Sequence, residues 1–391
     1  MERVLARGPQ LDSAGIGASG RLPHLDALKT VLTVAVIIAH AAMTYGAVGT
    51  WIYEEDVLSG VLGAALGALI VGGAPFTLGL FFLIAGMLTT RSLLRVGPGR
   101  FLRSRVVRLG IPVVVYALVV WPALHWVIDL VVEDGPRSPI ASYRDQFAGS
   151  AWQHLGTGPM WFVAILLIAT AGWCLWRMAR PDPWSRAAPT VIWRAVATMS
   201  LATFVIRLQF PIDSAQFLDL HVWLWPQAFV LFVVGALGAE QGWLFVIPVD
   251  MRRRLRLSLV IAGATLGAFV VFSDGVDRFA GGWHWQAAGF AAFEGVWSIG
   301  VSLLVLDWAR RHVPRMSFVM SQIARASYGA FVAQGPVLVA IALALRSAGL
   351  PGDVDFVVLA TLGVVVSFMV GLGLPTSVNR RVRPRTLRRR R

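Results

Sequence analysis

The chain has 391 residues, of which 57% are apolar and only 14% are charged. Soluble globular domains carry about a quarter charged residues, so this composition excludes an ordinary soluble protein and indicates a polytopic membrane protein. The net charge of +14 would suggest a nucleic-acid partner in a soluble protein, but membrane topology explains it better and no nucleic-acid partner is expected. The single cysteine, Cys174, excludes an intramolecular disulfide.

Apolar runs bounded by charged or Gly/Pro-rich segments predict an all-α bundle of about ten transmembrane helices. In chain order, the predicted spans are 27–48, 62–90, 107–132, 158–178, 191–206, 218–239, 256–273, 286–306, 324–345 and 355–375. The second contains VGGAP at 71–75, which predicts a short helix followed by a kinked span. The membrane domain is expected over 24–376, after an N-terminal cytoplasmic segment, 1–23, and before a basic cytoplasmic tail, 377–391.

The basic residues indicate the orientation of these spans. With the N-terminus inside, the cytoplasmic segments hold 30 of the 35 basic residues. This asymmetry follows the positive-inside rule and predicts that both termini are cytoplasmic. We therefore expect a multi-pass protein of the inner or plasma membrane, with its basic tail on anionic lipid.

The first predicted span carries a narrow polar stripe. At about 100° per residue, Asp26, Lys29, Thr33, His40 and Thr44 fall on one side of the helix. Lys29 is the single lysine of the chain, and His40 lies about 16 Å further along the helix axis. Taken alone, Lys29 can be an interfacial cation paired with Asp26, and His40 a neutral, hydrogen-bonded imidazole. Their alignment favours an aqueous or substrate-lined cavity.

Further charged residues enter predicted spans. Glu294 lies within the eighth span, where a carboxylate is protonated, paired or functional. Arg103, Arg105 and Arg108 precede or begin the third span. They are either positive-inside anchors or guanidinium groups for the phosphates of a cytoplasmic donor. The seven histidines show no metal-ligand spacing, so no metal site is expected.

Five segments stand out in chain order: LDALKTVLTVAVIIAH (25–40), GLFFLIAGMLTTRSL (79–93), RFLRSRVVRLGIPVVVY (100–116), GPMWFVAILL (158–167) and IARASYGAFVAQGPVL (323–338). In the same order, they resemble motifs of the acyltransferase 3 family of integral-membrane acyltransferases. Three positions depart from the family pattern: Lys29 replaces an Arg, Ala85 a Ser and Gln334 a His. The positive charge at position 29 is kept, but the bidentate fork of arginine is lost.

The resemblance implies an O-acyltransferase with acyl-CoA as its co-substrate and no metal. Arg105 and Arg108, with Arg103 and Lys29, would hold the phosphates of the donor. His40 would act as general base on an acceptor hydroxyl, because its ordinary pKa near 6.5 suits proton abstraction at neutral pH; a transient acyl-histidine is the other route.

The resemblance also suggests supporting groups and an acceptor class. Asp26 and Lys29 would join His40 in the catalytic set through the polar stripe, Glu294 would orient the imidazole, and Tyr328 or Gln334 would stabilise the oxyanion. The acceptor would be a carbohydrate, a glycolipid or a small hydroxylated molecule, reached from the outside, as transmembrane acyl transfer, or from the cytoplasm. The lipid bilayer is the remaining expected partner.

Two other classes of protein fit the same residues. A proton-coupled transporter or flippase would also need intramembrane Lys, His and Glu side chains. A non-catalytic scaffold or lipid-binding partner would use them only for packing, and it predicts that His40→Ala has no effect.

Overall fold

The protein is seen here as a computed structural model that describes residues 22–55, 58–132, 138–147, 156–180, 190–245, 247–273 and 277–374. Within these ranges the chain forms helices and no strand, which confirms the predicted all-α class. The helices are α1 (Pro23–Thr44), α2 (Gly60–Val96), α3 (Pro98–Arg105), α4 (Ile111–Val115), α5 (Trp121–Val132), α6 (Pro139–Phe147), α7 (Trp161–Ala179), α8 (Thr190–Arg207), α9 (Trp225–Gln241), α10 (Val249–Val271), α11 (Trp285–His312), α12 (Phe318–Arg346) and α13 (Gly352–Gly373).

Nine helical spans in the described part of the chain are long and apolar enough to cross a membrane. One of them is the continuous run Pro98–Val132, which joins α3, α4 and α5 through two π-helical turns, Val106–Gly110 and Tyr116–Val120. The predicted span 191–206 forms α8, a helix of 18 residues that is not among the nine. The polytopic bundle is thus confirmed; the segments beyond both of its ends lie outside the described residues.

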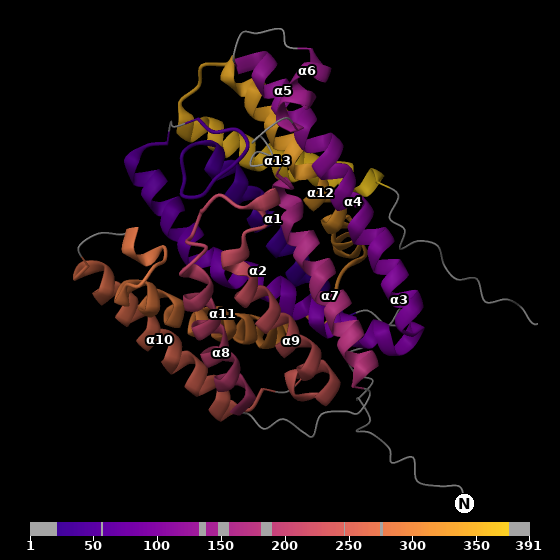
Figure 1. Cartoon of the computed structure of the whole chain (residues 1–391), viewed down its shortest axis with the longest axis vertical. Helices are drawn as coiled ribbons and strands as arrows, with labels where there is room; N and C mark the ends of the chain where they lie inside the picture. The colour runs from indigo at the N-terminus through magenta and orange to yellow at the C-terminus, as the bar shows by residue number, and fades with distance from the viewer. Residues whose placement is uncertain are drawn as a thin grey trace, which may run out of the picture.

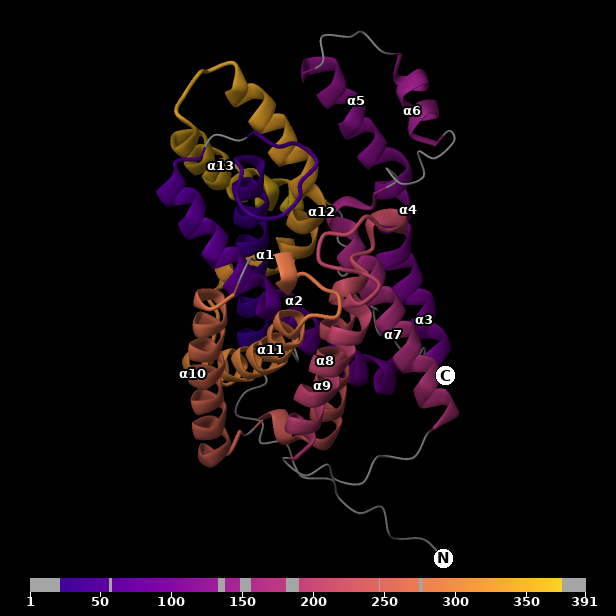
Figure 2. The ribbon, with the colours of Figure 1, turned by 60° about the vertical axis from the view of Figure 1, so that its left-hand side comes forward.

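Helix α1 lies at the centre of the bundle. It packs against α2, α11, α12 and α13, and Figure 1 shows these four helices around it. Helix α10 lies at one edge, and the α3–α5 run with α7 lies on the opposite side (Figure 2). A central α1 explains how residues at its two ends can face different parts of the molecule.

Helix α2 is longer and more continuous than predicted. It runs unbroken for 37 residues through Pro75, so the prediction of a separate short helix near VGGAP is wrong. Proline leaves a backbone carbonyl without its helical donor. Two donors on α11 serve this region: Trp297 Nε1 donates to the Gly72 carbonyl at 2.9 Å, and Ser298 Oγ donates to the Pro75 carbonyl at 2.6 Å. Neighbouring helices thereby allow proline inside a span.

The contact between α2 and α9 depends on two glycines. A Cβ on Gly86 would lie 2.1 Å from the Phe232 carbonyl oxygen, and one on Gly235 would lie 2.0 Å from that of Leu83. Any larger residue would force the backbones apart. Small residues permit this close approach where lipid offers no hydrophobic driving force for helix association.

Candidate functional site

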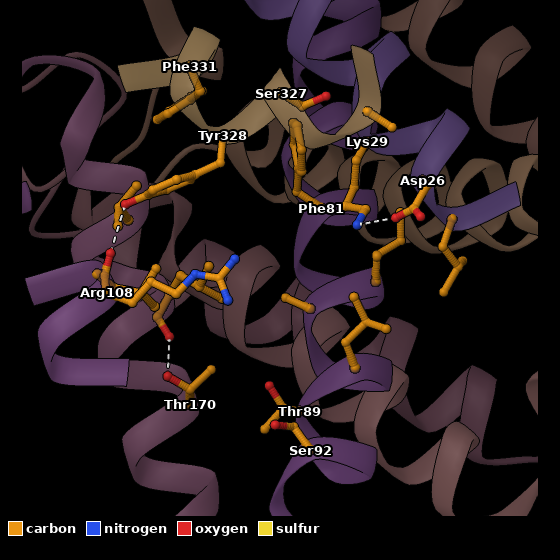
Figure 3. A pocket seen from close by; sticks show the side chains of 18 of the residues that line it. Asp26, Lys29, Phe81, Thr89, Ser92, Arg108, Thr170, Ser327, Tyr328 and Phe331 are labelled. Atoms are coloured by element: carbon orange, nitrogen blue, oxygen red, sulfur yellow. Dashed lines mark hydrogen bonds and ion pairs between the residues drawn. The ribbon is translucent and has the colours of Figure 1, made fainter. Parts of the chain in front are cut away.

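A cavity of about 610 Å³ opens among α1, α2, the α3–α4 junction, α7 and α12. Figure 3 shows that its labelled side chains converge from several helices toward a common space. The polar or charged lining residues are Asp26, Lys29, Thr33, Thr89, Arg91, Ser92, Arg95, Arg105, Arg108, Thr170, Ser321, Arg325, Ser327 and Tyr328. Apolar side chains, among them Phe81, Phe162 and Phe331, complete the wall.

The cavity is strongly basic. Its lining holds six cationic side chains, Lys29, Arg91, Arg95, Arg105, Arg108 and Arg325, and Asp26 as the one carboxylate. Such an excess of positive charge at short range attracts a multiply charged anion, and guanidinium forks match phosphate geometry. The arrangement can therefore hold a ligand with several phosphates.

Sequence reasoning identified some of these cations and missed others. Arg105, Arg108 and Lys29 were predicted, and all three line the cavity. Arg103 was grouped with them, but it is exposed and does not line the cavity. Arg91, Arg95 and Arg325 were missed as site residues, because in sequence they look like any other positive-inside residue near the end of a span.

Lys29 and Asp26 form an ion pair at the wall of this cavity. Lys29 Nζ lies 2.6 Å from Asp26 Oδ1, and the two side chains keep 32% and 21% of their surface exposed. The two residues are three positions apart, about one helical turn, so their side chains meet on the same face of α1. Figure 3 shows the pair on one side of the cavity and Arg108 on the other. A ligand in the cavity can therefore reach the lysine directly.

The arginines on the third span are positioned by an irregular helix. Arg105 ends α3, and Arg108 lies within the π-helical turn Val106–Gly110. The Tyr328 hydroxyl donates to the Arg108 carbonyl at 3.1 Å, which links this turn to α12. A π turn widens the helix and rotates the residues that follow, and such turns are frequent at functional sites. Tyr328 thus supports the cavity wall, and its hydroxyl proton is already engaged.

His40 lies in a different environment, further along α1. Its Nδ1 is 3.1 Å from Gln334 Oε1 on α12, and its ring stacks on Trp51 with centroids 4.0 Å apart. An amide oxygen can only accept a hydrogen bond, so Nδ1 donates to it. Gln334, which stands where the resembled family has a histidine, thereby orients the ring, and in the neutral imidazole the lone pair is then on Nε2.

Two buried polar groups at the Gln334–Gly335 segment of α12 have no hydrogen-bond partner within the described structure. They are Gln334 Nε2, on the residue that contacts His40, and the Tyr116 hydroxyl. Tyr116 packs directly on Gly335, where a Cβ would lie 2.0 Å from the phenolic oxygen. Buried donors without partners are costly, and a functional site is one reason to keep them. Both can donate to an oxygen atom that develops negative charge.

The cavity and the surroundings of His40 are close but separate. His40 does not line the cavity, whose wall on α1 ends at Thr33 and on α12 at Phe331. Thr33 precedes His40 by seven residues, about 10 Å along the helix, and Phe331 precedes Gln334 by about one turn. The rings of Phe331 and Phe162 lie 5.6 Å apart between centroids. A ligand held by the cations therefore needs an extended arm to reach His40.

The hydroxyl groups of the stripe threonines are used inside α1. Thr33 donates to the Lys29 carbonyl at 2.8 Å and Thr44 to the His40 carbonyl at 3.1 Å, and both side chains are buried. Their hydroxyl protons are satisfied within α1. The predicted stripe thus divides into a charged end, Asp26 and Lys29, and a neutral end, His40.

Glu294 does not line the cavity, and its partner in the described structure is not His40. Its carboxylate pairs with Arg207 of α8, with Oε1 at 3.0 Å from Nη2 and Oε2 at 2.5 Å from Nη1. Trp223 and Phe290 flank this guanidinium, each with its ring centroid 5.6 Å away. The predicted contact of Glu294 with the His40 imidazole is therefore absent from the described structure, in which the Nδ1 of His40 faces Gln334. Arg207 was the missed partner.

The chain was compared with known proteins. The model of the acyltransferase 3 family, described as an acyltransferase domain, matches residues 22–374. No curated protein and no solved structure matches this chain. The match covers nearly the whole described structure, including both parts of α1, and it confirms the family that the sequence segments indicated.

Proposed function

Because the chain belongs to the acyltransferase 3 family, we propose that this membrane acyltransferase moves an acyl group from acyl-CoA to a hydroxyl of its acceptor, with His40 as general base. One observation carries the proposal. The helix that presents Lys29 to the basic cavity also presents His40, about 16 Å away, with Nδ1 hydrogen-bonded and no hydrogen bond to Nε2 from the described residues.

The donor side of the proposal rests on charge. A CoA-type donor carries several phosphates, and the cavity offers six cations against one carboxylate. Its pantetheine arm is long and narrow, as the separation between the cavity and His40 requires. Positive-inside topology would put this cavity on the cytoplasmic side of the inner or plasma membrane, where acyl-CoA is found.

The chemical step uses the neutral tautomer of His40. Nε2 takes the proton from the acceptor hydroxyl while the oxygen attacks the thioester carbonyl carbon. Gln334 Nε2 and the Tyr116 hydroxyl donate to the oxyanion of the tetrahedral intermediate. The carbon–sulfur bond then breaks, and the thiolate leaves with the proton from His40. An imidazole whose Nδ1 is already bonded suits this general-base route.

The acceptor is proposed as a class. A hydroxyl is the group that His40 can deprotonate, so a carbohydrate, a glycolipid or a small hydroxylated molecule fits. Trp51, which stacks on His40, offers a flat apolar surface beside the reacting atoms. Such a surface packs well against a sugar ring or an apolar acceptor.

Measurement of thiol release tests the function. Purified protein would be incubated with acetyl-, succinyl- or longer-chain acyl-CoA and a panel of hydroxylated acceptors, and free CoA thiol and acylated product would be followed. We expect equal amounts of thiol and product. Accumulation of a solute in protein-containing vesicles without thioester cleavage would instead support a transporter or flippase.

A matched pair of variants tests the donor site. Arg108→Gln should raise the KM for the donor about 10- to 100-fold, the effect of losing a charge-assisted hydrogen bond. Arg103→Gln, which removes the same charge five residues away but outside the cavity, should stay within about twofold. Equal effects of both substitutions would mean that general surface charge, and not this cavity, holds the donor.

A further inference from the structure

A second basic cavity lies between α10 and α11, apart from the site described above. Its volume is about 410 Å³, and its lining consists of Val249, Arg252, Arg253, Arg256 and Arg311. The first four residues come from the first two turns of α10 and the fifth from the last turn of α11. No residue of this lining also lines the larger cavity.

The positive charge of this cavity is only partly compensated. Asp307 of α11 is nearly buried and contacts three arginines: Arg252 at 3.5 Å, Arg310 at 3.3 Å, and Arg311. One carboxylate cannot neutralise three guanidinium groups. Arg253 and Arg256 are exposed, and none of the ion pairs between described residues includes them. Their donors face the cavity without an anionic partner in the described structure.

The same side of α10 continues into an apolar surface. On a helical wheel, Val249, Arg253, Arg256, Leu257 and Val260 fall within about 100°. Leu257 and Val260 are 59% and 70% exposed. Helix α10 lies at the edge of the bundle (Figures 1 and 2) and packs on α11. Within its most apolar stretch of 18 residues, only 6% is buried. A membrane-spanning helix in this position has its free face toward lipid.

We propose that this cavity binds the phosphate headgroup of an anionic phospholipid, whose acyl chains lie along the exposed face of α10. Arginine forks bind a phosphodiester bidentately. A free phosphate ion would not contact the apolar strip beside these arginines, whereas the acyl chains of a lipid would. The strip therefore favours a lipid over a soluble anion. Basic pockets between spanning helices suit such headgroups.

Binding would also strengthen a contact between helices. The arginines of the lining come from both α10 and α11. Asp307 pairs with Arg252 and Arg311 but with neither Arg253 nor Arg256, so part of the repulsion across the cavity is not compensated within the described structure. A bound headgroup would reduce this remaining repulsion and add a second bridge between the two helices.

Lipid retention in the purified full-length protein tests the proposal. The protein in detergent would be mixed with phosphatidylglycerol or with phosphatidylcholine of identical chains, and bound lipid would be counted by native mass spectrometry. We expect about tenfold stronger retention of phosphatidylglycerol, and the Arg253→Gln/Arg256→Gln variant should reduce it to the phosphatidylcholine level. Phosphatidylglycerol, but not phosphatidylcholine, should also raise the melting temperature of the wild type.

A control variant separates the site from net charge. Arg254→Gln/Arg315→Gln removes two exposed arginines outside the cavity and should retain phosphatidylglycerol within about twofold of the wild type. Equal loss in the two double variants would overturn the proposal, as would equal retention of the two lipids by the wild type. Full displacement of the lipid by inorganic phosphate in the millimolar range would also overturn it, because the site would then be one for a soluble anion.

Discussion

Two ion pairs inside the bundle have the same chemistry and opposite surroundings. Lys29 and Asp26 lie one turn apart on α1, 2.6 Å from atom to atom, with 32% and 21% of their side chains exposed at the wall of the basic cavity. Arg207 and Glu294 come from α8 and α11, with only 2% and 10% exposed. Aromatic rings flank the second pair.

The difference shows which charges are available to a ligand. Lys29 is partly exposed in a cavity whose lining also holds five arginines, so a phosphate there could replace Asp26 as its partner. Arg207 is enclosed, and its exchange would leave Glu294 as a buried charge without a partner. The first pair is therefore the one that we assign to ligand binding in the proposed function, and the second joins α8 to α11. Three substitutions test this division.

The largest effect is expected from Glu294→Ala. It leaves the Arg207 guanidinium buried and uncompensated, so stability should fall by about 3–5 kcal/mol. Thermal unfolding in detergent would measure the loss. The Arg207→Met/Glu294→Leu double variant should recover most of it, because neither charge is then buried. Normal stability with abolished activity in Glu294→Ala would instead support the catalytic role that the sequence predicted for Glu294.

A smaller effect, on activity alone, is expected from Lys29→Met. The loss of one phosphate contact should lower kcat/KM for the donor about 10- to 100-fold, while the melting temperature hardly changes because the side chain is partly exposed. Lys29→Arg should keep most of the activity, since it keeps the charge. Steady-state kinetics with both variants would show whether Lys29 contributes to donor binding. Full activity in Lys29→Met would mean that Lys29 serves only as an interfacial anchor.

The smallest effect is expected from Asp26→Asn. Its carboxylate competes with phosphate for Lys29, and partly exposed pairs contribute at most about 1 kcal/mol. The KM for the donor should therefore fall by up to about fivefold, with kcat unchanged. A loss of kcat in this variant would contradict the view that Asp26 only positions Lys29.

The sequence predicted much of the fold because apolar runs report burial in lipid directly. It also predicted that Lys29 and His40 share one helix, because the helical period places them on one side. It did not predict that α2 continues through Pro75, since the donors that serve this region, Trp297 and Ser298, come from α11.

The partners of the site residues were harder to predict. Gln334 meets His40 across 294 residues of chain, and Arg207 meets Glu294 across 87. Such contacts depend on how helices pack, and no local pattern records them. Gln334 was identified as a departure from the family and as a possible oxyanion donor, but its hydrogen bond to His40 Nδ1 became visible only in the structure.

The central claim is that His40 removes the proton of the acceptor while the basic cavity holds the donor. Its most direct test is His40→Ala, studied in a single turnover with donor bound and the acceptor that supports turnover in the wild type. We predict that donor affinity stays the same while the rate of acyl transfer falls about 10²- to 10⁴-fold, the usual contribution of a general base. Transfer at the wild-type rate would contradict the account.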